Sequence, residues 1–285
     1  MKIIRNPEAF QKEMRSLRSR GKRIGFVPTM GALHAGHSAL VKAALRQNDR
    51  VAVSIFVNPS QFGPQEDLSR YPRPFRRDAA LLKNAGAHFL FAPSAAGIYP
   101  AGYTLCVDEL KQPGLTDRLC GKNRPGHFRG VMTVCAKLFN LAQPSAVYFG
   151  QKDYQQSVVI ETMLREFHWG IRFYRIPTVR EADGLALSSR NIYLSGEERK
   201  RACALSRSLF FLQGELCRRR KDLPGLLRRA RRMLAASFDK VDYLEIVDPE
   251  TLESLVRPQA EMTALGAAFL GKTRLIDNVI IRLPK

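Results

Sequence analysis

Two histidines, His34 and His37, stand three residues apart shortly after the apolar run at residues 24–27. We expect a strand over that run and a helix over residues 36–47, whose first N–H groups would point back toward the strand tip. A helix start of this kind binds anions, and two imidazoles beside it could donate hydrogen bonds to phosphate oxygens. Gly36 would let a flat ligand approach the backbone closely. Residues 30–37 are therefore a candidate phosphate site.

The segment matches none of the common nucleotide or zinc signatures. No Gly-Lys-Ser/Thr follows its glycines, and the Gly-x-Gly-x-x-Gly spacing is absent. The chain has no Cys-x-x-Cys, and the histidines lack the i, i+4 spacing of a zinc helix. The alternative is a buried β–α turn with two incidental histidines. Two of only five histidines within four positions argue against it.

Polar loops follow most of the expected strands, which cover residues 23–27, 51–57, 88–91, 146–149 and 171–176. Helices are expected over residues 7–20, 36–47, 75–85, 127–141 and 154–167. Continuous apolar strands separated by helices predict a parallel sheet covered on both faces. Ligands of such sheets bind beyond the carboxyl ends of the strands, where the loops 58–64, 150–156 and 180–191 lie.

Those loops carry groups suited to a triphosphate. Lys152 would supply a compact positive charge, Arg190 could bind a phosphate with two hydrogen bonds, and Ser188 and Ser189 could fill the remaining acceptors. No covalent nucleophile is evident, so the predicted chemistry is phosphate-centred transfer by positioning and charge stabilisation. For Lys152 the alternative is an ordinary surface lysine, and its place in a strand-tip loop beside Asp153 argues against that.

The pattern changes from about residue 196. Two basic helices, over 196–219 and 223–237, precede an alternating strand at 241–247 and apolar runs at 264–270 and 275–281. We therefore expect an α/β chain with a Rossmann-like, doubly wound parallel-sheet domain over residues 1–184. A smaller α+β lid domain is expected over residues 185–285.

Composition narrows the class of protein. Hydrophobic residues make up 45% of the chain and charged residues 25%, as in soluble globular enzymes. No apolar stretch could span a bilayer, and the first residues lack the apolar core of a signal peptide. The five cysteines are scattered without metal or disulfide spacing. We expect a cytoplasmic protein without membrane association.

The net charge of +20 includes a dense basic patch at residues 199–232, with 12 basic and 2 acidic residues. Such a patch could bind nucleic acid. Its only aromatic residues, Phe210 and Phe211, are expected in the core, which favours solvated helix faces instead. Nucleic-acid binding is therefore not expected, although the positive field would attract anionic substrates.

Five segments in the correct order resemble the pantoate–β-alanine ligase family of the nucleotidyltransferase superfamily. They are residues 28–37, 57–62, 149–156, 183–191 and 272–278, and the resemblance spans essentially the whole chain. It implies ATP-dependent condensation of (R)-pantoate with β-alanine to give pantothenate, a coenzyme A precursor, with AMP and diphosphate as products. A pantoyl adenylate is the implied intermediate. The alternative is another nucleotidyltransferase that merely transfers AMP to a phosphate or a carboxylate.

The resemblance also implies the site residues. His34, His37, Lys152 and Arg190 would be catalytic, with His37 as the proton donor. The residues that would bind ATP are Met30, Gly31, Ala32, Leu33, His34, Ala35, Gly36, His37, Gly150, Gln151, Lys152, Asp153, Val179, Leu187, Ser188, Ser189 and Arg190. Gln61 and Gln156 would hold pantoate, and Gln61 would also bind β-alanine. Asn58, Arg124 and His127 are further candidates.

Mg²⁺ as cofactor of ATP and a homodimer are also implied. The chain departs from the family pattern at two places. Gln151 stands where the family usually has glutamate, and Asp78 is the only acidic residue left soon after Tyr71-Pro72-Arg73. Asp78 is therefore the one candidate for a metal ligand in that segment, and otherwise ATP and water would hold the ion.

Overall fold

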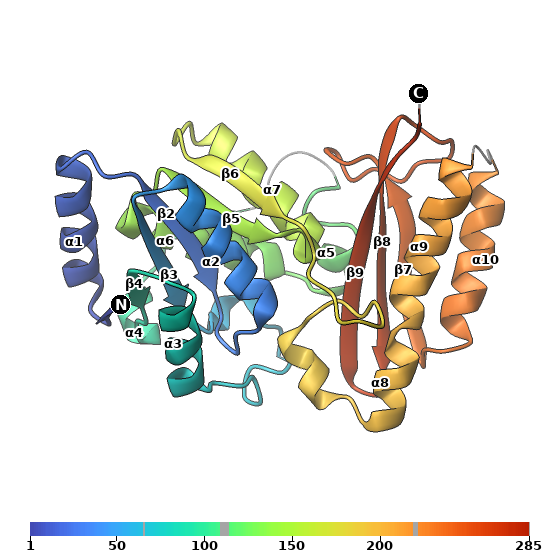
Figure 1. Cartoon of the computed structure of the whole chain (residues 1–285), viewed down its shortest axis with the longest axis horizontal. Coiled ribbons are helices and arrows are strands. Elements are labelled where there is room, and N and C mark those ends of the chain that lie inside the picture. Colours follow the sequence, from blue (N-terminus) through green and yellow to red (C-terminus); the bar gives the residue numbers. More distant parts are fainter. Residues whose placement is uncertain (65, 109–113, 219–221, 285) are drawn as a thin grey trace. The chain divides into compact units, whose positions relative to one another are not determined.

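The computed structural model describes residues 1–64, 66–108, 114–218 and 222–284. The chain divides into two compact units (Figure 1). The first comprises Met1–Lys111, Thr116–Gln151 and Gln156–Pro177, and the second comprises Gln112–Leu115, Lys152–Gln155 and Thr178–Lys285. The short segment Lys152–Gln155 thus belongs to the second unit although its chain neighbours belong to the first.

The first unit is built on a six-stranded parallel sheet in the order β1-β4-β3-β2-β5-β6. Its strands are β1 (Lys2–Ile4), β2 (Ile24–Thr29), β3 (Arg50–Ile55), β4 (Phe89–Phe91), β5 (Ala146–Gly150) and β6 (Arg172–Ile176). The predicted parallel sheet is confirmed, and β1 is an additional short strand that the sequence analysis did not predict. From the central strand β2 the chain moves outward to β3 on one side, and β5 lies on the other side. Loops after β2 and its neighbours therefore meet at the switch point where such sheets bind ligands.

Helices connect these parallel strands (Figure 1). From β2 to β4 the connections lead toward the β1 edge of the sheet, and from β4 to β6 they lead toward the β6 edge. The helices are α1 (Pro7–Ser19), α2 (Ala35–Gln47), α3 (Phe75–Asn84), α4 (Ala95–Ile98), α5 (Cys120–Asn123), α6 (His127–Ala142) and α7 (Tyr154–Glu166), with the 3₁₀ turns η1 (Pro59–Gln61) and η2 (Gln151–Asp153). Helix α1 contacts α6, and α2 contacts α3. Right-handed crossovers in opposite directions put these two pairs on opposite faces of the sheet.

Aromatic packing fixes the α1 and α6 side of this sheet. Phe10 of α1 stacks on Phe91 of β4 with ring centroids 4.2 Å apart, and Phe26 of β2 meets Phe139 of α6 edge-on at 6.3 Å. Phe10 and Phe26 are fully buried. Such pairs add specific geometry to the large apolar area that they remove from water.

The second unit has a three-stranded antiparallel sheet, β7 (Lys240–Val247), β8 (Glu261–Leu270) and β9 (Thr273–Arg282), in that order. Its helices are α8 (Gly196–Ala202), α9 (Ala204–Cys217) and α10 (Leu223–Ala235), and the 3₁₀ turn η3 covers Ser189–Tyr193. Helix α9 packs on β8 and β9 (Figure 1). The small antiparallel sheet expected from the sequence is confirmed.

The single helix expected over residues 196–219 is wrong, because the helix is interrupted at Cys203. Helix α8 ends at Ala202 and α9 begins at Ala204. Ala202, Cys203 and Leu205 all enter the same apolar core. The break allows residues before and after it to be buried together. The spacing of apolar residues along a helix does not predict such a break.

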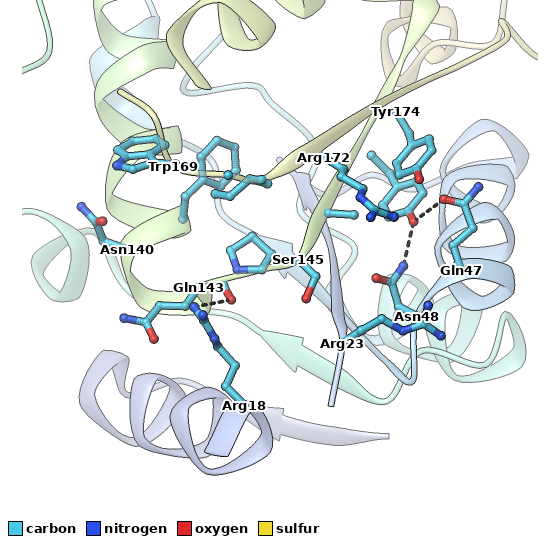
Figure 2. Close-up of a pocket in the computed structure, with 16 residues that line it drawn as sticks. Arg18, Arg23, Gln47, Asn48, Asn140, Gln143, Ser145, Trp169, Arg172 and Tyr174 are labelled. Carbon is cyan, nitrogen blue, oxygen red and sulfur yellow. Dashed lines mark hydrogen bonds between the residues drawn. The ribbon is translucent and has the colours of Figure 1, made fainter. Parts of the chain in front are cut away.

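A polar pocket of about 520 Å³ lies at the amino ends of β2, β5 and β6 (Figure 2). Arg18, Arg23 and Arg172 are among its lining residues. The Tyr148 hydroxyl accepts a hydrogen bond from Asn48 at 2.7 Å and donates one to Gln47 at 3.0 Å. This pocket lies at the edge of the sheet opposite the strand-tip loops, so it is separate from the predicted site.

Candidate active site

Two histidines cap helix α2 through each other's backbone. His34 is the residue before the helix, and its Nδ1 accepts the Gly36 N–H at 3.2 Å. The Nδ1 of His37 accepts the His34 N–H, also at 3.2 Å. A ring nitrogen that accepts must carry no hydrogen, so each neutral ring has its hydrogen on Nε2. The cap therefore selects the tautomer in which Nε2–H is a donor, beside a helix start that favours anions.

The loop before this helix is held by Asp78 from α3. Asp78 Oδ2 accepts the Ala32 N–H at 2.8 Å, and Oδ1 accepts the Leu33 N–H at 2.9 Å. Gly31 and Ala32 have φ values of +88° and +49°. A non-glycine residue in this region costs about 1–2 kcal/mol, and charge-assisted hydrogen bonds offset that cost. Burial raises the pKa of Asp78, while the two N–H donors oppose that shift.

A magnesium site on the protein does not fit these residues. Both oxygens of Asp78 serve the loop backbone, and the residue is 1% exposed. Within the described ranges, no three His, Cys, Asp or Glu residues are grouped so that they could hold a metal ion. The Asp78 carboxylate therefore serves to hold the loop.

Next to the loop lies a buried pair of amides, Asn58 and Gln61, at the turn after β3. Asn58 Nδ2 donates to Gln61 Oε1 and to the Gly130 carbonyl, each at 3.1 Å. Asn58 Oδ1 accepts from the Tyr99 hydroxyl at 2.7 Å. Gln61 Nε2 contacts the Met30 sulfur at 3.0 Å. The orientation of both amides is thus fixed, and Gln61 is tied to the loop that starts at Met30.

Arg124 and His127 hold the backbone of Gln61. Arg124 Nη1 lies 2.9 Å from His127 Nε2, and His127 Nδ1 lies 2.9 Å from the Gln61 carbonyl. Arginine only donates, so His127 Nε2 accepts and its Nδ1–H donates to Gln61. Arg124 also pairs with Glu66, with Nε 2.8 Å from Oε1. Glu66 was not predicted, and its only signal was an acidic group in the polar loop after β3.

The two neighbouring glutamines at 155 and 156 differ in their surroundings. Gln155 is buried and donates to the Leu115 carbonyl at 2.9 Å, which is a structural role. Gln156 is half-buried, and the part of the chain that the structure describes provides no hydrogen-bond partner for its side chain. Among the described residues, no hydrogen bond therefore joins Gln156 to Gln61.

Two of the predicted phosphate residues of the second unit, Lys152 and Ser188, line one small cavity. Its lining includes Lys152, Ser188, Asn191 and Asp277. Lys152 Nζ lies 3.7 Å from the Asp153 carboxylate, and the lysine side chain is 19% exposed. Ser188 caps η3, because its hydroxyl accepts the Arg190 N–H at 3.3 Å. The turn that carries Ser189 and Arg190 thus begins beside Lys152.

A hairpin leads into that turn. The Leu187 N–H donates to the Val179 carbonyl at 3.0 Å, which pairs two residues expected near ATP. Arg199 of α8 contacts Glu181 and Asp183, each at 2.7 Å. The Arg199 guanidinium holds the pKa of Asp183 well below its usual range. Gly150 and Gln151 lie at the end of β5 and the start of η2, directly before Lys152.

The basic patch at 199–232 is largely engaged by neighbouring acceptors. Arg201 pairs with Asp239, and Arg218 and Arg229 both pair with Glu215. Arg231 donates to the Leu244 carbonyl. Arg219, Arg220 and Lys221 lie outside the described residues. Phe210 is 44% exposed and lies under the Arg180 guanidinium, so its predicted place in the core is wrong.

The sequence model of the pantoate–β-alanine ligase family matches residues 2–280. The chain belongs to this ligase family. The predicted family is therefore confirmed, and so is the expectation of a ligase enzyme.

Relatives in this ligase family match over nearly their full length. Pantothenate synthetase 1 of Bradyrhizobium diazoefficiens is 51% identical, over 99% of this chain and 98% of the relative. Pantothenate synthetase of Moorella thermoacetica is 47% identical over 99% of each chain.

Solved structures agree with the fold of the ligase family. Pantothenate synthetase from Thermus thermophilus has a TM-score of 0.93 and 44% identity, over 98% of this chain and 99% of that chain. Pantoate-β-alanine ligase from Francisella tularensis, complexed with β-γ ATP and β-alanine, has a TM-score of 0.80 and 35% identity, over 98% and 97% of the chains. The predicted fold class is confirmed. No helix in the described ranges combines the length and apolar character needed to cross a bilayer.

Proposed function

We propose that this chain condenses (R)-pantoate with β-alanine at the expense of ATP, giving pantothenate, AMP and diphosphate. The observation that carries the proposal is the match of one ligase family over residues 2–280. The arrangement of the loop, cap and amides supports it, because the site offers donors for anions and no evident covalent nucleophile. One related structure supports it as well, since the Francisella tularensis ligase is complexed with β-γ ATP and β-alanine.

In the first step, a pantoate carboxylate oxygen attacks the α-phosphorus of ATP. A new phosphorus–oxygen bond forms, the bond to the β-phosphate oxygen breaks, and diphosphate leaves with that electron pair. The product is pantoyl adenylate. Negative charge grows on the diphosphate, so donors placed there accelerate the step without covalent chemistry.

In the second step, the neutral amine of β-alanine attacks the acyl carbon of the adenylate. The carbon–nitrogen bond forms, the carbon–oxygen bond breaks, AMP leaves with that electron pair, and the nitrogen gives up a proton to the AMP phosphate or to water. A buried amide that can contact both pantoate and the amine would orient this attack, and Gln61 is the residue assigned to it. The backbone carbonyl of Gln61 accepts a hydrogen bond from His127, and its side-chain Oε1 accepts one from Asn58.

The ATP contacts that we propose come from three segments. His34 and His37 would donate their Nε2 hydrogens to phosphate oxygens, with His37 as the proton donor. Lys152 would neutralise one phosphate, and Arg190 would clamp another together with the hydroxyls of Ser188 and Ser189. The remaining proposed contacts are Met30, Gly31, Ala32, Leu33, Ala35, Gly36, Gly150, Gln151, Asp153, Val179 and Leu187.

The acid substrates have fewer assigned residues. We assign pantoate to Gln61 and Gln156, and β-alanine to Gln61, with Asn58, Arg124 and His127 as supporting groups. Magnesium would enter bound to ATP, with water completing its shell, as this ion tolerates. We further propose a homodimer located in the cytoplasm, and light scattering of the purified protein tests the dimer.

The decisive experiment is the exchange of labelled diphosphate into ATP. We expect exchange that requires pantoate and does not require β-alanine, because the first step alone is reversible. Exchange without pantoate, or no exchange with it, would overturn the proposal. A panel of other hydroxy acids tests the alternative, in which AMP is passed to a different acid. Nucleic-acid binding is checked separately by titration above about 0.1 M salt, where purely electrostatic binding weakens strongly.

A further inference from the structure

Two consecutive residues of β9, Asp277 and Asn278, contact the Lys152 segment and the hairpin that leads to Ser188. Asn278 Nδ2 donates to the Lys152 carbonyl at 2.9 Å. Asp277 forms a paired contact with Arg180, with Oδ2 2.6 Å from Nη1 and Oδ1 2.9 Å from Nη2. Both β9 residues are buried, at 3% and 1% exposure. One stretch of strand therefore holds the Lys152 segment and the Arg180 hairpin together.

Arg180 passes this contact on to the hairpin that precedes Ser188. Its Nη1 also donates to the Gly184 carbonyl at 3.0 Å, and its backbone pairs with Ala186. The guanidinium lies 4.9 Å from the centre of the Phe210 ring. Its Nη2 donates to the Asn278 carbonyl at 3.3 Å as well. A guanidinium with two carboxylate contacts and two carbonyl contacts has little freedom to turn. The position of the hairpin end, and hence of Ser188, depends on Asp277.

The Asn278 contact acts on Lys152 itself. The backbone N–H of Asn278 donates to Asp277 Oδ1 at 2.8 Å, so the Asp277 carboxylate is tied to the main chain of the residue whose side chain holds Lys152. Lys152, Ser188 and Asp277 line the same small cavity. An amide that fixes the Lys152 carbonyl limits where the ammonium can reach.

We propose that Asp277 and Asn278 are positioning residues of the ligase reaction. They hold the Lys152 segment and the Ser188–Arg190 turn at the spacing that lets both bind the same triphosphate. This inference rests on the proposed function. It assigns to β9 a role in the first step only, because the β- and γ-phosphates have left before β-alanine reacts.

The test compares Asn278→Ala with Gln213→Ala. Gln213 Nε2 donates to the Ile280 carbonyl at 2.8 Å, so each variant removes one side-chain amide donor to a backbone carbonyl in the same unit. Among the described residues, no hydrogen bond joins the Gln213 side chain to either phosphate segment, and its variant is the matched control. Asn278→Asp keeps the volume but removes the donor, and Arg180→Lys keeps the charge but removes the paired geometry.

We expect Asn278→Ala and Asn278→Asp to lower pantoate-dependent diphosphate exchange at saturating substrates by about tenfold to a hundredfold. Arg180→Lys should mainly raise the KM for ATP. Gln213→Ala should stay within about twofold of the unchanged protein, since it leaves these segments in place. With synthetic pantoyl adenylate and β-alanine, all four variants should form pantothenate at the unchanged rate.

The outcomes separate the two proposals. Unchanged exchange in the Asn278 variants would overturn the inference and leave the proposed function standing. An equal loss in both steps, or the same loss in Gln213→Ala, would also overturn it, because that result indicates a general structural defect. Absence of exchange in the unchanged protein would overturn the proposed function, and the inference with it.

Discussion

His34 and His37 are joined by a reciprocal contact in which each ring's Nδ1 accepts a backbone N–H of the turn that begins α2. The ring centroids are 4.2 Å apart. The contact gives the histidines a structural task on one ring nitrogen and places the hydrogen on the other. A substitution can therefore remove the proposed phosphate contact of a histidine and still keep its hydrogen bond to the start of the helix.

Substitution of His34 separates these two tasks. Asparagine is among the best residues before a helix, so His34→Asn should keep the cap and the free energy of unfolding. His34→Ala should lose about 1 kcal/mol of stability. Both should lower diphosphate exchange strongly, since neither has Nε2–H. Urea unfolding and the exchange assay measure the two effects, and near-normal exchange in His34→Asn would refute the phosphate role.

Asp78→Asn tests whether this carboxylate holds the loop or a metal ion. The amide can accept only one of the two N–H groups of Ala32 and Leu33, and its own N–H₂ faces the other. An unsatisfied buried donor costs about 1–3 kcal/mol, so urea unfolding should show a loss of that size. The KM for ATP should rise because the loop moves.

The magnesium requirement provides the contrast for Asp78. If the residue only holds the loop, the Mg²⁺ concentration for half-maximal exchange should be the same in Asp78→Asn and in the unchanged protein. A clear increase in that concentration would restore Asp78 as a metal ligand. Arg76→Ala, at an exposed position on the same helix, is the control.

Gly130→Ala should damage the proposed pantoate site although alanine favours helices. A Cβ at Gly130 would collide with the Ser60 carbonyl oxygen and lie 2.7 Å from Gln61 Cα. The helix gain of about 1 kcal/mol is outweighed by overpacking, which costs about 1–3 kcal/mol. We expect lower stability and a higher KM for pantoate. Gly214→Ala in α9, with nothing within 4 Å of its Cβ, should be neutral or stabilising, and a matching loss there would contradict the explanation.

Lys152→Ala should lower diphosphate exchange by orders of magnitude while the protein stays folded. The lysine side chain is partly exposed, and its one ion pair among the described residues is a 3.7 Å contact with Asp153, so its removal leaves the core intact. Circular dichroism and thermal unfolding check the fold. Lys42→Ala, an exposed lysine on α2, controls for the loss of one positive charge. Normal exchange in Lys152→Ala would reject the role assigned to it.

Gln151→Glu restores the residue that the family usually carries. Gln151 is only half-buried in η2, so an added carboxylate can be solvated. We expect stability to change by less than about 0.5 kcal/mol and exchange to change only a few-fold. A loss as large as that of Lys152→Ala would show that the chain has adapted to glutamine.

Much of the fold was determined by sequence pattern. The apolar runs at 24–27, 51–57 and 146–149 became the central strands, because a strand buried on both faces needs apolar residues throughout. The same alternation of apolar runs and polar segments predicted the loops that follow these strands. Strand β1 was not predictable in this way, since three residues carry little periodicity and its pairing with β4 is a long-range event.

The sequence by itself determined the residue types of the site: two histidines at a helix start, a lysine after β5 and a serine–arginine turn. Only the tertiary structure decided what holds them. Asp78 reaches the Ala32–Leu33 backbone from 45 residues away, and Asn278 reaches Lys152 from 126 residues away. Local composition is set by neighbours along the chain, whereas a buried donor finds its acceptor only after the elements have packed.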